Sequence, residues 1–255
     1  MIQNKYFIFD LDDTLLNKNR DVSEYTLTGI NKLRDNNFII VINTARSFKA
    51  TLRLINIIKP DYSICNAGAT IYDSNNNLIY KKTISIKDTN EIINYLKESD
   101  DVKNFSIQTI DNLYTPEEDY VLKNKLAIYN DFNKPLEEES VKILIASYNQ
   151  DKWKEIINKY NYQFESYFNG LWFRIANSNK YEGNIKLFEI LNDNNPKDYV
   201  FGDDLGDLEM IKKAHHGVLM CNSKQVSAEY NISKYSNDED GAIRYMLEEV
   251  EGIKQ

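Results

Sequence analysis

Residues 6–15, YFIFDLDDTL, set the fold and the first candidate site of this 255-residue chain. The run 6–9 is apolar and aromatic, and a second apolar run, rich in β-branched residues, follows at 38–42. Both runs are typical of strands buried on both faces of a parallel sheet. Between them, Ser23 can cap a helix whose apolar residues recur every three or four positions. The segment therefore predicts a βαβ unit.

A second unit of the same kind follows. A helix is expected to begin at Ser47, to carry Leu52, Ile55 and Ile58, and to end at Pro60, before a strand at 62–65. The first third of the chain is therefore predicted to be doubly wound α/β, and a β-hairpin is expected after it.

The regular alternation of predicted strands and helices stops at about residue 83, where short strand candidates mix with helices. It returns beyond Asn184. We therefore predict an α/β fold with a doubly wound parallel-sheet, Rossmann-like core. The core would comprise residues 1–82 and 177–255, and an α/β cap domain, residues 83–176, would be inserted between them.

Composition excludes several classes of protein. Hydrophobic residues make up 42% and charged residues 27% of the chain, which is typical of a globular protein. A formal net charge of -8 argues against nucleic acid as a partner. Two cysteines fit a reducing compartment, and no apolar run approaches a membrane span. A cytoplasmic monomer or small homo-oligomer without a membrane partner is expected.

Acidic residues gather after two predicted strands. Asp10 and Asp12 follow the first strand, and residues 202–207, GDDLGD, follow a strand near 199–201. An open parallel sheet binds ligands at the carboxyl ends of its strands. Two acidic strand ends in one sheet suggest a shared hard cation such as Mg²⁺. Taken singly, the first run is as compatible with an acidic surface loop as with a site, and the second is better explained as an acid-rich helix start.

Groups suited to an anion follow the second strand and precede a later helix. Thr44 and Arg46 offer a hydroxyl and a guanidinium, and Lys180 offers an ammonium. Phosphate fits these donors. Taken singly, Thr44 could cap a turn, and Arg46 and Lys180 could be ordinary solvated charges.

The ordered combination of these four motifs resembles the haloacid-dehalogenase-like phosphohydrolase superfamily. The long insertion, with residues 65–69, CNAGA, and 238–242, DEDGA, is similar to its Cof-type branch with a class IIB cap. The resemblance extends over nearly the whole chain, although the cap matches only in position and size.

The resemblance implies specific roles. Asp10 would be the nucleophile that forms an aspartyl-phosphate, and Asp12 would be the general acid and base. Thr44 and a lysine would hold phosphoryl oxygens, and Arg46 and Asn66 would lie near the substrate. Mg²⁺ would be bound by Asp10, the backbone carbonyl of Asp12, Asp203 and Asp207, with Asp204 as a further candidate.

The sequence departs from the family pattern at three places. Glu182-Gly183 stands where Lys-Gly is usual, so the lysine role would pass to Lys180 or, as the weaker candidate, to Lys186. Gly206 stands where the Cof branch has Asn, and Ala45 where Gly is common. In the insertion, Glu165, Tyr167, Trp172 and Arg174 are candidates for residues that face the active site, and residues 137–139, EEE, are expected to be a solvated turn.

These features predict a Mg²⁺-dependent phosphatase for small phosphomonoesters such as sugar phosphates. A phosphomutase or phosphotransferase using the same aspartyl-phosphate is the nearest alternative. A non-catalytic sensor of a phosphorylated ligand is the alternative from a different class, favoured by Glu182 and Gly206.

Overall fold

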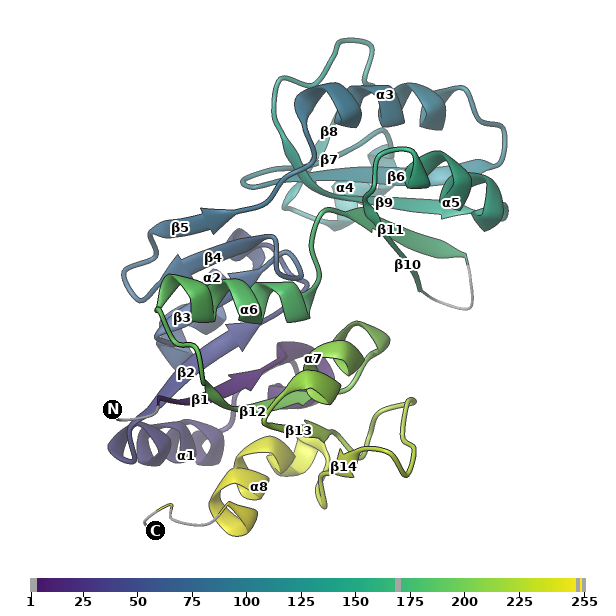
Figure 1. Ribbon diagram of the computed structural model, residues 1–255. Helices are drawn as coiled ribbons and strands as arrows, with labels where there is room; N and C mark the ends of the chain where they lie inside the picture. Colours follow the sequence, from purple (N-terminus) through teal and green to yellow (C-terminus); the bar gives the residue numbers. More distant parts are fainter. Residues whose placement is uncertain (1–3, 168–170, 251–252, 254–255) are drawn as a thin grey trace. The chain divides into compact units, whose positions relative to one another are not determined.

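The computed structural model describes residues 4–167, 171–250 and 253, and these form two compact units (Figure 1). The first unit contains residues 1–46, 51–80 and 180–255, and the second contains residues 47–50 and 81–179. The predicted insertion, 83–176, falls within the second unit. That this unit acts as a cap stays a prediction.

The first unit is built on an eight-stranded sheet of order β14-β13-β12-β1-β2-β3-β4-β5. The strands from β14 to β3 are parallel, and β4 runs antiparallel to β3. The parallel-sheet α/β core is therefore confirmed. Its strands are β1 (Lys5–Phe9), β2 (Phe38–Asn43), β3 (Tyr62–Cys65), β4 (Thr70–Asp73), β5 (Leu78–Lys81), β12 (Lys197–Gly202), β13 (His216–Leu219) and β14 (Asn231–Ile232).

Helices cover both faces of this sheet (Figure 1). The helices α6 and α7 pack on the face that carries Tyr6 and Ile8 of β1. On the other face α1 contacts α8, and Arg34 of α1 donates to the carbonyl of Ile58 at the end of α2. The helices are α1 (Glu24–Asp35), α2 (Phe48–Ile58), α6 (Lys180–Ile190), α7 (Leu208–Lys213) and α8 (Gly241–Glu249).

Local sequence explains where these helices begin and what they bury. Ser23 caps α1 as predicted, because its Oγ accepts a hydrogen bond of 2.9 Å from the amide of Thr26. One of the three apolar residues expected on α2 lies outside its buried face. Leu52 is 37% exposed, and Leu54 is buried beside Ile55 and Ile58.

The second unit has a six-stranded sheet of order β10-β11-β9-β6-β7-β8, in which only β7 and β8 pair in parallel. Its buried apolar face packs against α3 and α5. The elements are α3 (Ile86–Lys97), β6 (Val102–Thr109), β7 (Leu113–Thr115), α4 (Glu118–Lys123), β8 (Ala127–Tyr129), β9 (Ser140–Ser147), α5 (Gln150–Asn158), β10 (Gln163–Tyr167) and β11 (Trp172–Ala176).

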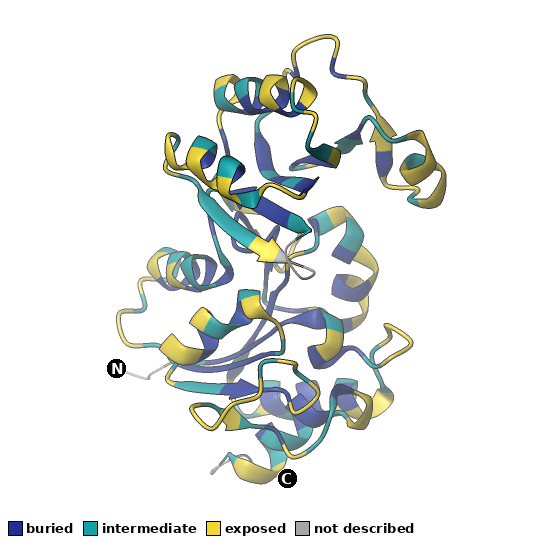
Figure 2. Ribbon diagram, turned by 90° about the vertical axis from the view of Figure 1, so that its right-hand side faces the viewer, coloured by how far each residue is buried: buried dark blue, intermediate teal, exposed yellow. Residues whose placement is uncertain are grey.

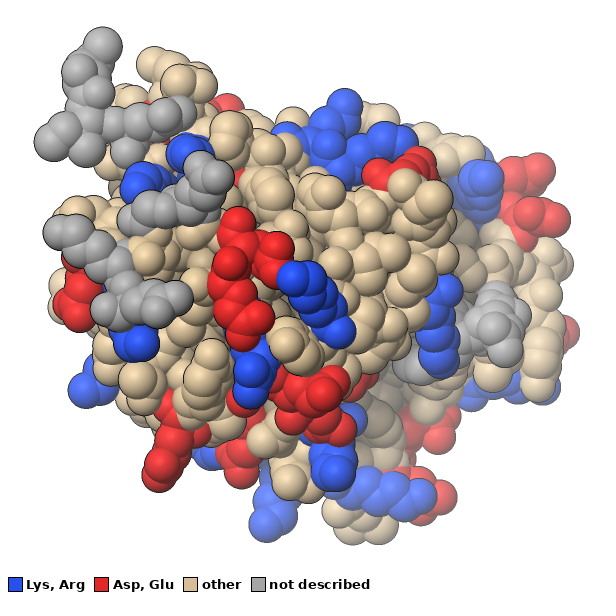
Figure 3. Space-filling model, turned by 90° about the horizontal axis from the view of Figure 1, so that it is seen from below, with Lys and Arg blue, Asp and Glu red and all other residues tan. Residues whose placement is uncertain are grey.

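Burial follows this layering. Figure 2 shows that the strands of the parallel sheet are largely buried, whereas the outer sides of the helices are exposed. On the face of the molecule shown in Figure 3, acidic and basic side chains are interspersed. Within the described ranges, none of the helices combines the length and apolar character needed to cross a membrane.

Candidate functional site

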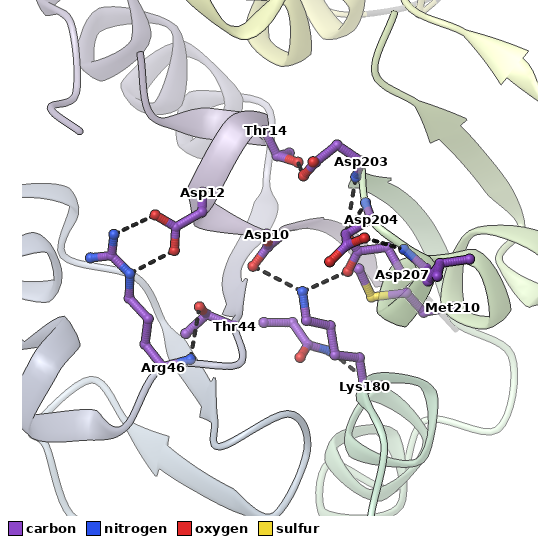
Figure 4. A network of polar contacts seen from close by, with 12 residues as sticks. Asp10, Asp12, Thr14, Thr44, Arg46, Lys180, Asp203, Asp204, Asp207 and Met210 are labelled. Atoms are coloured by element: carbon purple, nitrogen blue, oxygen red, sulfur yellow. Dashed lines mark hydrogen bonds and ion pairs between the residues drawn. The ribbon is translucent and has the colours of Figure 1, made fainter. Parts of the chain in front are cut away.

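Four charged side chains from separate parts of the sequence meet in the first unit (Figure 4). Asp10 follows the carboxyl end of β1, and Asp203 and Asp207 follow that of the neighbouring strand β12. Lys180 is the first residue of α6. Because parallel strands place their carboxyl ends at one edge, Asp10 and Asp203 come together there, and the amide of Asp10 donates to the carbonyl of Phe201 at 3.1 Å.

Lys180 links two of the carboxylates. Its Nζ lies 2.9 Å from Oδ1 of Asp10 and 2.6 Å from Oδ1 of Asp207. The side chains of Lys180, Asp10 and Asp207 are only 7%, 9% and 0% exposed, so water screens these charges little. Among the two lysines that the sequence left open, Lys180 is therefore the one that lies among the acids.

The loop after β12 fixes Asp207 in place. Its Oδ2 accepts hydrogen bonds from the amides of Asp203 (3.0 Å) and Asp204 (3.1 Å). A Cβ at Gly202 would lie 2.4 Å from the Cβ of Asp207, so only glycine fits this close approach. Asp204 is exposed, and its carboxylate accepts from the amide of Leu205 as a cap of the short 3₁₀ turn.

Burial shifts the pKa values of this cluster. Burial raises the pKa of Asp10, against the lowering effect of Lys180. Burial, together with the charges of Asp207 and Asp10, raises the pKa of Asp203 to about 8. Burial alone would lower the pKa of Lys180, but the two carboxylates beside it outweigh that effect and raise it. The three carboxylates of the cluster thus outnumber its single ammonium group.

A divalent cation would supply that charge. Asp10, Asp203 and Asp207 each offer a carboxylate oxygen, and these oxygens lie within 4.8 Å of one another. Such all-oxygen ligands suit a hard cation such as Mg²⁺, so the residues present fit a metal. Asp203 is further oriented by Thr14, whose hydroxyl donates to its Oδ1 at 2.9 Å. The carboxylate groups of Asp12 and Asp204 do not belong to this set.

Asp12 instead forms an ion pair with Arg46. Arg46 Nε lies 2.7 Å from Oδ2 of Asp12, and its Nη2 contacts Oδ1, which makes the pair bidentate (Figure 4). The Asp12 side chain is 41% exposed, so it stands at the surface of the site. Thr44 lies between Arg46 and Lys180 in Figure 4, and its hydroxyl accepts a hydrogen bond of 3.3 Å from the amide of Arg46.

Asn66 is held near Thr44 and Arg46 by the backbone. Its amide donates to the carbonyl of Arg46 at 2.8 Å, and the amide of Ala67 donates to that of Thr44 at 2.9 Å. Asn66, Ala67 and Gly68 all have positive φ angles (53°, 54° and 94°). The side chain of Asn66 is buried, and among the described residues its Oδ1 has no hydrogen-bond partner.

The structure shows the surroundings of three residues at or next to the departures from the family pattern, Gly183, Lys186 and Gly206. A Cβ at Gly183 would lie 2.8 Å from the Cα of Gly68, so this glycine lets α6 approach the loop after β3. Lys186 is 37% exposed, pairs with Glu189 and lies over the ring of Tyr80. A Cβ at Gly206 would meet no atom within 4 Å, so the glycine there is not a steric requirement.

Sequence reasoning missed the residues that orient Lys180. The side chain of Asn43, at the end of β2, donates to the carbonyl of Lys180 at 2.9 Å and to Oδ1 of Asn184 at 2.7 Å. Both asparagines are buried. The sequence did contain a signal for Asn43, because it is a polar residue at the end of an apolar strand. Its neighbours Thr44 and Arg46 were chosen instead because their side chains are better suited to bind an anion.

A model of the haloacid dehalogenase-like hydrolase family matches residues 7–246. Two Bacillus subtilis relatives, YitU and YcsE, are named 5-amino-6-(5-phospho-D-ribitylamino)uracil phosphatases. They are 24% and 26% identical to this chain, over 94% and 95% of it and 95% and 96% of their own lengths.

Solved structures show the same fold. TM0651 from Thermotoga maritima has a TM-score of 0.79 at 25% identity and covers 98% of both chains. The subclass IIB sugar phosphatase BT4131 has a TM-score of 0.77 at 18% identity, covering 96% of this chain and 98% of its own. The family match spans both acidic strand ends, and the chain belongs to the haloacid dehalogenase-like hydrolase family.

Proposed function

We propose that this protein is a Mg²⁺-dependent phosphatase that hydrolyses phosphomonoesters of sugars or sugar alcohols through an aspartyl-phosphate. The observation that carries the proposal is the meeting of Asp10, Asp203, Asp207 and Lys180 at one edge of the parallel sheet. Three carboxylates and one ammonium carry a net charge of -2, which a bound divalent cation would neutralise before a phosphoryl group approaches.

In the first step an oxygen of Asp10 attacks phosphorus in line with the ester bond. The new Asp10–phosphorus bond forms as the bond from phosphorus to the ester oxygen breaks. Asp12 gives a proton to the departing alkoxide, which leaves as the alcohol. Because Arg46 holds the ionised Asp12 in a bidentate pair, Asp12 must first take up a proton from water, which it can do when Arg46 turns to an anionic oxygen of the substrate.

In the second step Asp12 takes a proton from water, whose oxygen attacks phosphorus and releases Asp10 and inorganic phosphate. Lys180 and Thr44 would hold the phosphoryl oxygens, where negative charge must be stabilised. Asp10, Asp203, Asp207 and the backbone carbonyl of Asp12 would bind Mg²⁺, which when bound neutralises charge so that carboxylate and phosphate can approach.

The relatives support the substrate class. The names of the two Bacillus subtilis relatives describe a phosphorylated ribityl chain, and the structural neighbour BT4131 is a sugar phosphatase. These substrates share a phosphate ester on a polyhydroxylated carbon chain. We infer that the substrate of this protein has that group in common with theirs.

Phosphate release from a panel of sugar and polyol phosphates, with and without Mg²⁺, tests the proposal. Asp10→Asn should abolish release, with a loss of at least about 10³-fold, because the nucleophile is removed at nearly constant volume. Asp204→Asn is the matched control, since this exposed residue caps a turn and an asparagine caps equally well.

The same assay separates the alternatives. Release that appears only when a second sugar is added would favour a phosphotransferase or mutase. A folded protein that is stabilised by a sugar phosphate but releases nothing from any of them would favour a sensor. Unchanged release by Asp10→Asn would refute the aspartyl-phosphate.

A further inference from the structure

Two buried asparagines of the first unit are hydrogen-bonded to each other between β2 and α6. Asn43 is the last residue of β2, and Asn184 lies one turn into α6. The Nδ2 of Asn43 donates to Oδ1 of Asn184 at 2.7 Å and to the carbonyl of Lys180 at 2.9 Å. The side chain of Asn43 therefore joins the end of a sheet strand to the first turn of α6.

The carbonyl of Lys180 determines which way the amide of Asn43 points. A carbonyl oxygen can only accept, so the Nδ2 of Asn43 must face it. The Oδ1 of Asn43 is then buried without a hydrogen-bond partner among the described residues. The Nδ2 of Asn184 lies 4.0 Å from the sulfur of Met210, a weak acceptor. The pair thus keeps a buried acceptor unsatisfied.

The fold alone does not require this polar pair. An α-helix already supplies the carbonyl of its first residue with a donor, the amide four residues on. The neighbours on the same face of the strand and of the helix, Val41 and Leu187, belong to an apolar core cluster. Two apolar side chains would pack there without leaving an acceptor unsatisfied. A pair kept at this cost indicates a function beyond folding.

The position of the pair indicates what that function is. Thr44 follows Asn43 directly and is fixed to the chain around β3. Its amide donates to the carbonyl of Ile64, and its carbonyl accepts from the amide of Ala67, both at 2.9 Å. Lys180 carries the ammonium that lies among the acids (Figure 4). Asn43 therefore links the backbone of one proposed phosphate-binding residue to the backbone of the other.

We propose that Asn43 is a positioning residue that sets the distance between the Thr44 hydroxyl and the Lys180 ammonium, so that both reach the same phosphoryl group. This inference rests on the proposed phosphatase function. A lysine reaches its ligand through a flexible stem of four carbons, so its backbone must be fixed if the ammonium is to be placed accurately. Asn184 keeps Asn43 in the orientation that bonds the Lys180 carbonyl.

The test separates placement of Lys180 from stability. The double variant Asn43→Leu/Asn184→Leu replaces both amides by apolar groups of the same branched shape, and Asn43→Ala removes the donor alone. Asn36→Leu is the control, because the half-buried Asn36 also donates to a helix carbonyl, that of Lys32 at 2.8 Å, in α1.

Three quantities are measured on the full-length proteins. Urea unfolding gives stability. kcat and KM are determined for the phosphomonoester that the wild type hydrolyses fastest. Isothermal titration calorimetry with Mg²⁺ gives the affinity for orthovanadate, which forms an in-line adduct that mimics the transferring phosphoryl group.

The double variant should unfold at the wild-type urea concentration or above, since it leaves no buried amide unpaired. Its kcat should nevertheless fall by about 10- to 100-fold, the loss expected for a misplacement of about 1 Å. Its affinity for orthovanadate should fall by a similar factor, whereas KM should change by less than about threefold. Asn36→Leu should match the wild type in kcat and in orthovanadate affinity.

Other outcomes would overturn the assignment. Wild-type kcat and orthovanadate affinity in the double variant would give the pair a purely structural role, and so would an equal loss of kcat in Asn36→Leu. If the double variant does not fold, Asn43→Ala carries the same comparison, and near-wild-type kcat in that variant would refute the proposal. A wild type that binds orthovanadate but hydrolyses no phosphomonoester would refute the phosphatase function, and the orthovanadate affinities would still judge Asn43. A wild type that does neither would refute both.

Discussion

The two units each contain a buried cation, and these cations differ in how many of their donors have a partner within the protein. Lys180 in the first unit contacts two carboxylates, those of Asp10 and Asp207. Arg174 in the second unit contacts one carboxylate, and its Nε and Nη1 have no partner among the described residues. The ammonium of Lys180 is therefore satisfied by the protein itself, whereas the guanidinium of Arg174 still has donors to offer.

The difference shows what each region gains from a ligand. At Lys180 a phosphoryl group must compete with existing ion pairs, so a cation that takes over the carboxylates makes Lys180 available. At Arg174 the single described ion pair, with Glu165, leaves the other two nitrogens without a partner among the described residues. Binding of a phosphoryl group at the first region should depend strongly on metal and pH.

The largest effect is expected when Lys180, whose ammonium contacts two carboxylates, is replaced. Lys180→Met leaves Asp10 and Asp207 without their common partner, which should cost about 3 kcal/mol of unfolding free energy and lower turnover by about 10²- to 10³-fold. Urea unfolding and phosphate release measure the two effects. Lys186→Met is the matched control, and its exposed pair with Glu189 should contribute less than about 0.5 kcal/mol. The opposite ranking would move the phosphate-binding role to Lys186.

The second expected effect is on pH dependence. The pKa of Asp203 is raised from 3.8 to about 8, so the folded, metal-free protein holds this proton more tightly than the unfolded chain. Its contribution to stability is thus present below about pH 4 and is lost as pH rises through about 8. Mg²⁺ should therefore raise the melting temperature more at pH 8.5 than at pH 5.5, as measured by thermal unfolding. Equal shifts at both values would contradict a cation bound by Asp203.

In the second unit, the contribution of Asp101 to stability should depend on pH in the opposite sense to that of Asp203. Asp101 accepts hydrogen bonds from Ser147 (2.7 Å), Lys152 (2.5 Å) and the Trp153 indole (3.0 Å). Burial opposes the ionised form, but these donors outweigh it and lower the pKa of Asp101 to about 2. Its contribution to stability is present above pH 4 and is lost as pH falls through about 2.

Asp101→Asn should therefore lower the unfolding free energy at pH 7 by about 1 kcal/mol, a modest value because the side chain is partly exposed. Chemical unfolding monitored by tryptophan fluorescence measures this loss. The exposed neighbour Asp100 provides the control, and Asp100→Asn should behave as the wild type. A loss that is the same for both variants would show that the three donors do not single out Asp101.

The smallest effect is expected at Gly206. A Cβ there meets no atom within 4 Å, so Gly206→Asn should change the unfolding free energy by less than about 0.5 kcal/mol. Thermal unfolding and phosphate release of this single variant measure the effect. A marked gain in turnover would show that the glycine impairs an otherwise complete family site.

Much of the first unit could be predicted because its strands are short, apolar and followed by reactive residues. The acids at the ends of β1 and β12 follow from the rule that parallel strands end at one edge. The choice between Lys180 and Lys186 could not be made, because it depends on where α6 begins. Six residues along a helix rotate a side chain by roughly 240°, which places Lys186 on a different side of α6 from Lys180.

The second unit was harder to predict. The short elements α4, β8 and β10 were missed, because their sequences carry little periodicity and tertiary contacts decide their conformation. Residues 137–139 were expected to be a solvated turn, which was wrong for Glu138. Its carboxylate accepts hydrogen bonds from Thr109, Asn112 and Tyr114, residues that lie more than twenty positions earlier and therefore leave no local pattern.

The position of β1 between β2 and β12 also constrains when the parallel sheet and its site can form during synthesis. β1 is made before β2, but its other neighbour β12 is made nearly two hundred residues after β1. The strands of the second unit are all made before β12. The cluster around Asp10 therefore cannot form until Lys180 and Asp207 have been made, and a chain that stops before them lacks the site on which the proposed chemistry depends.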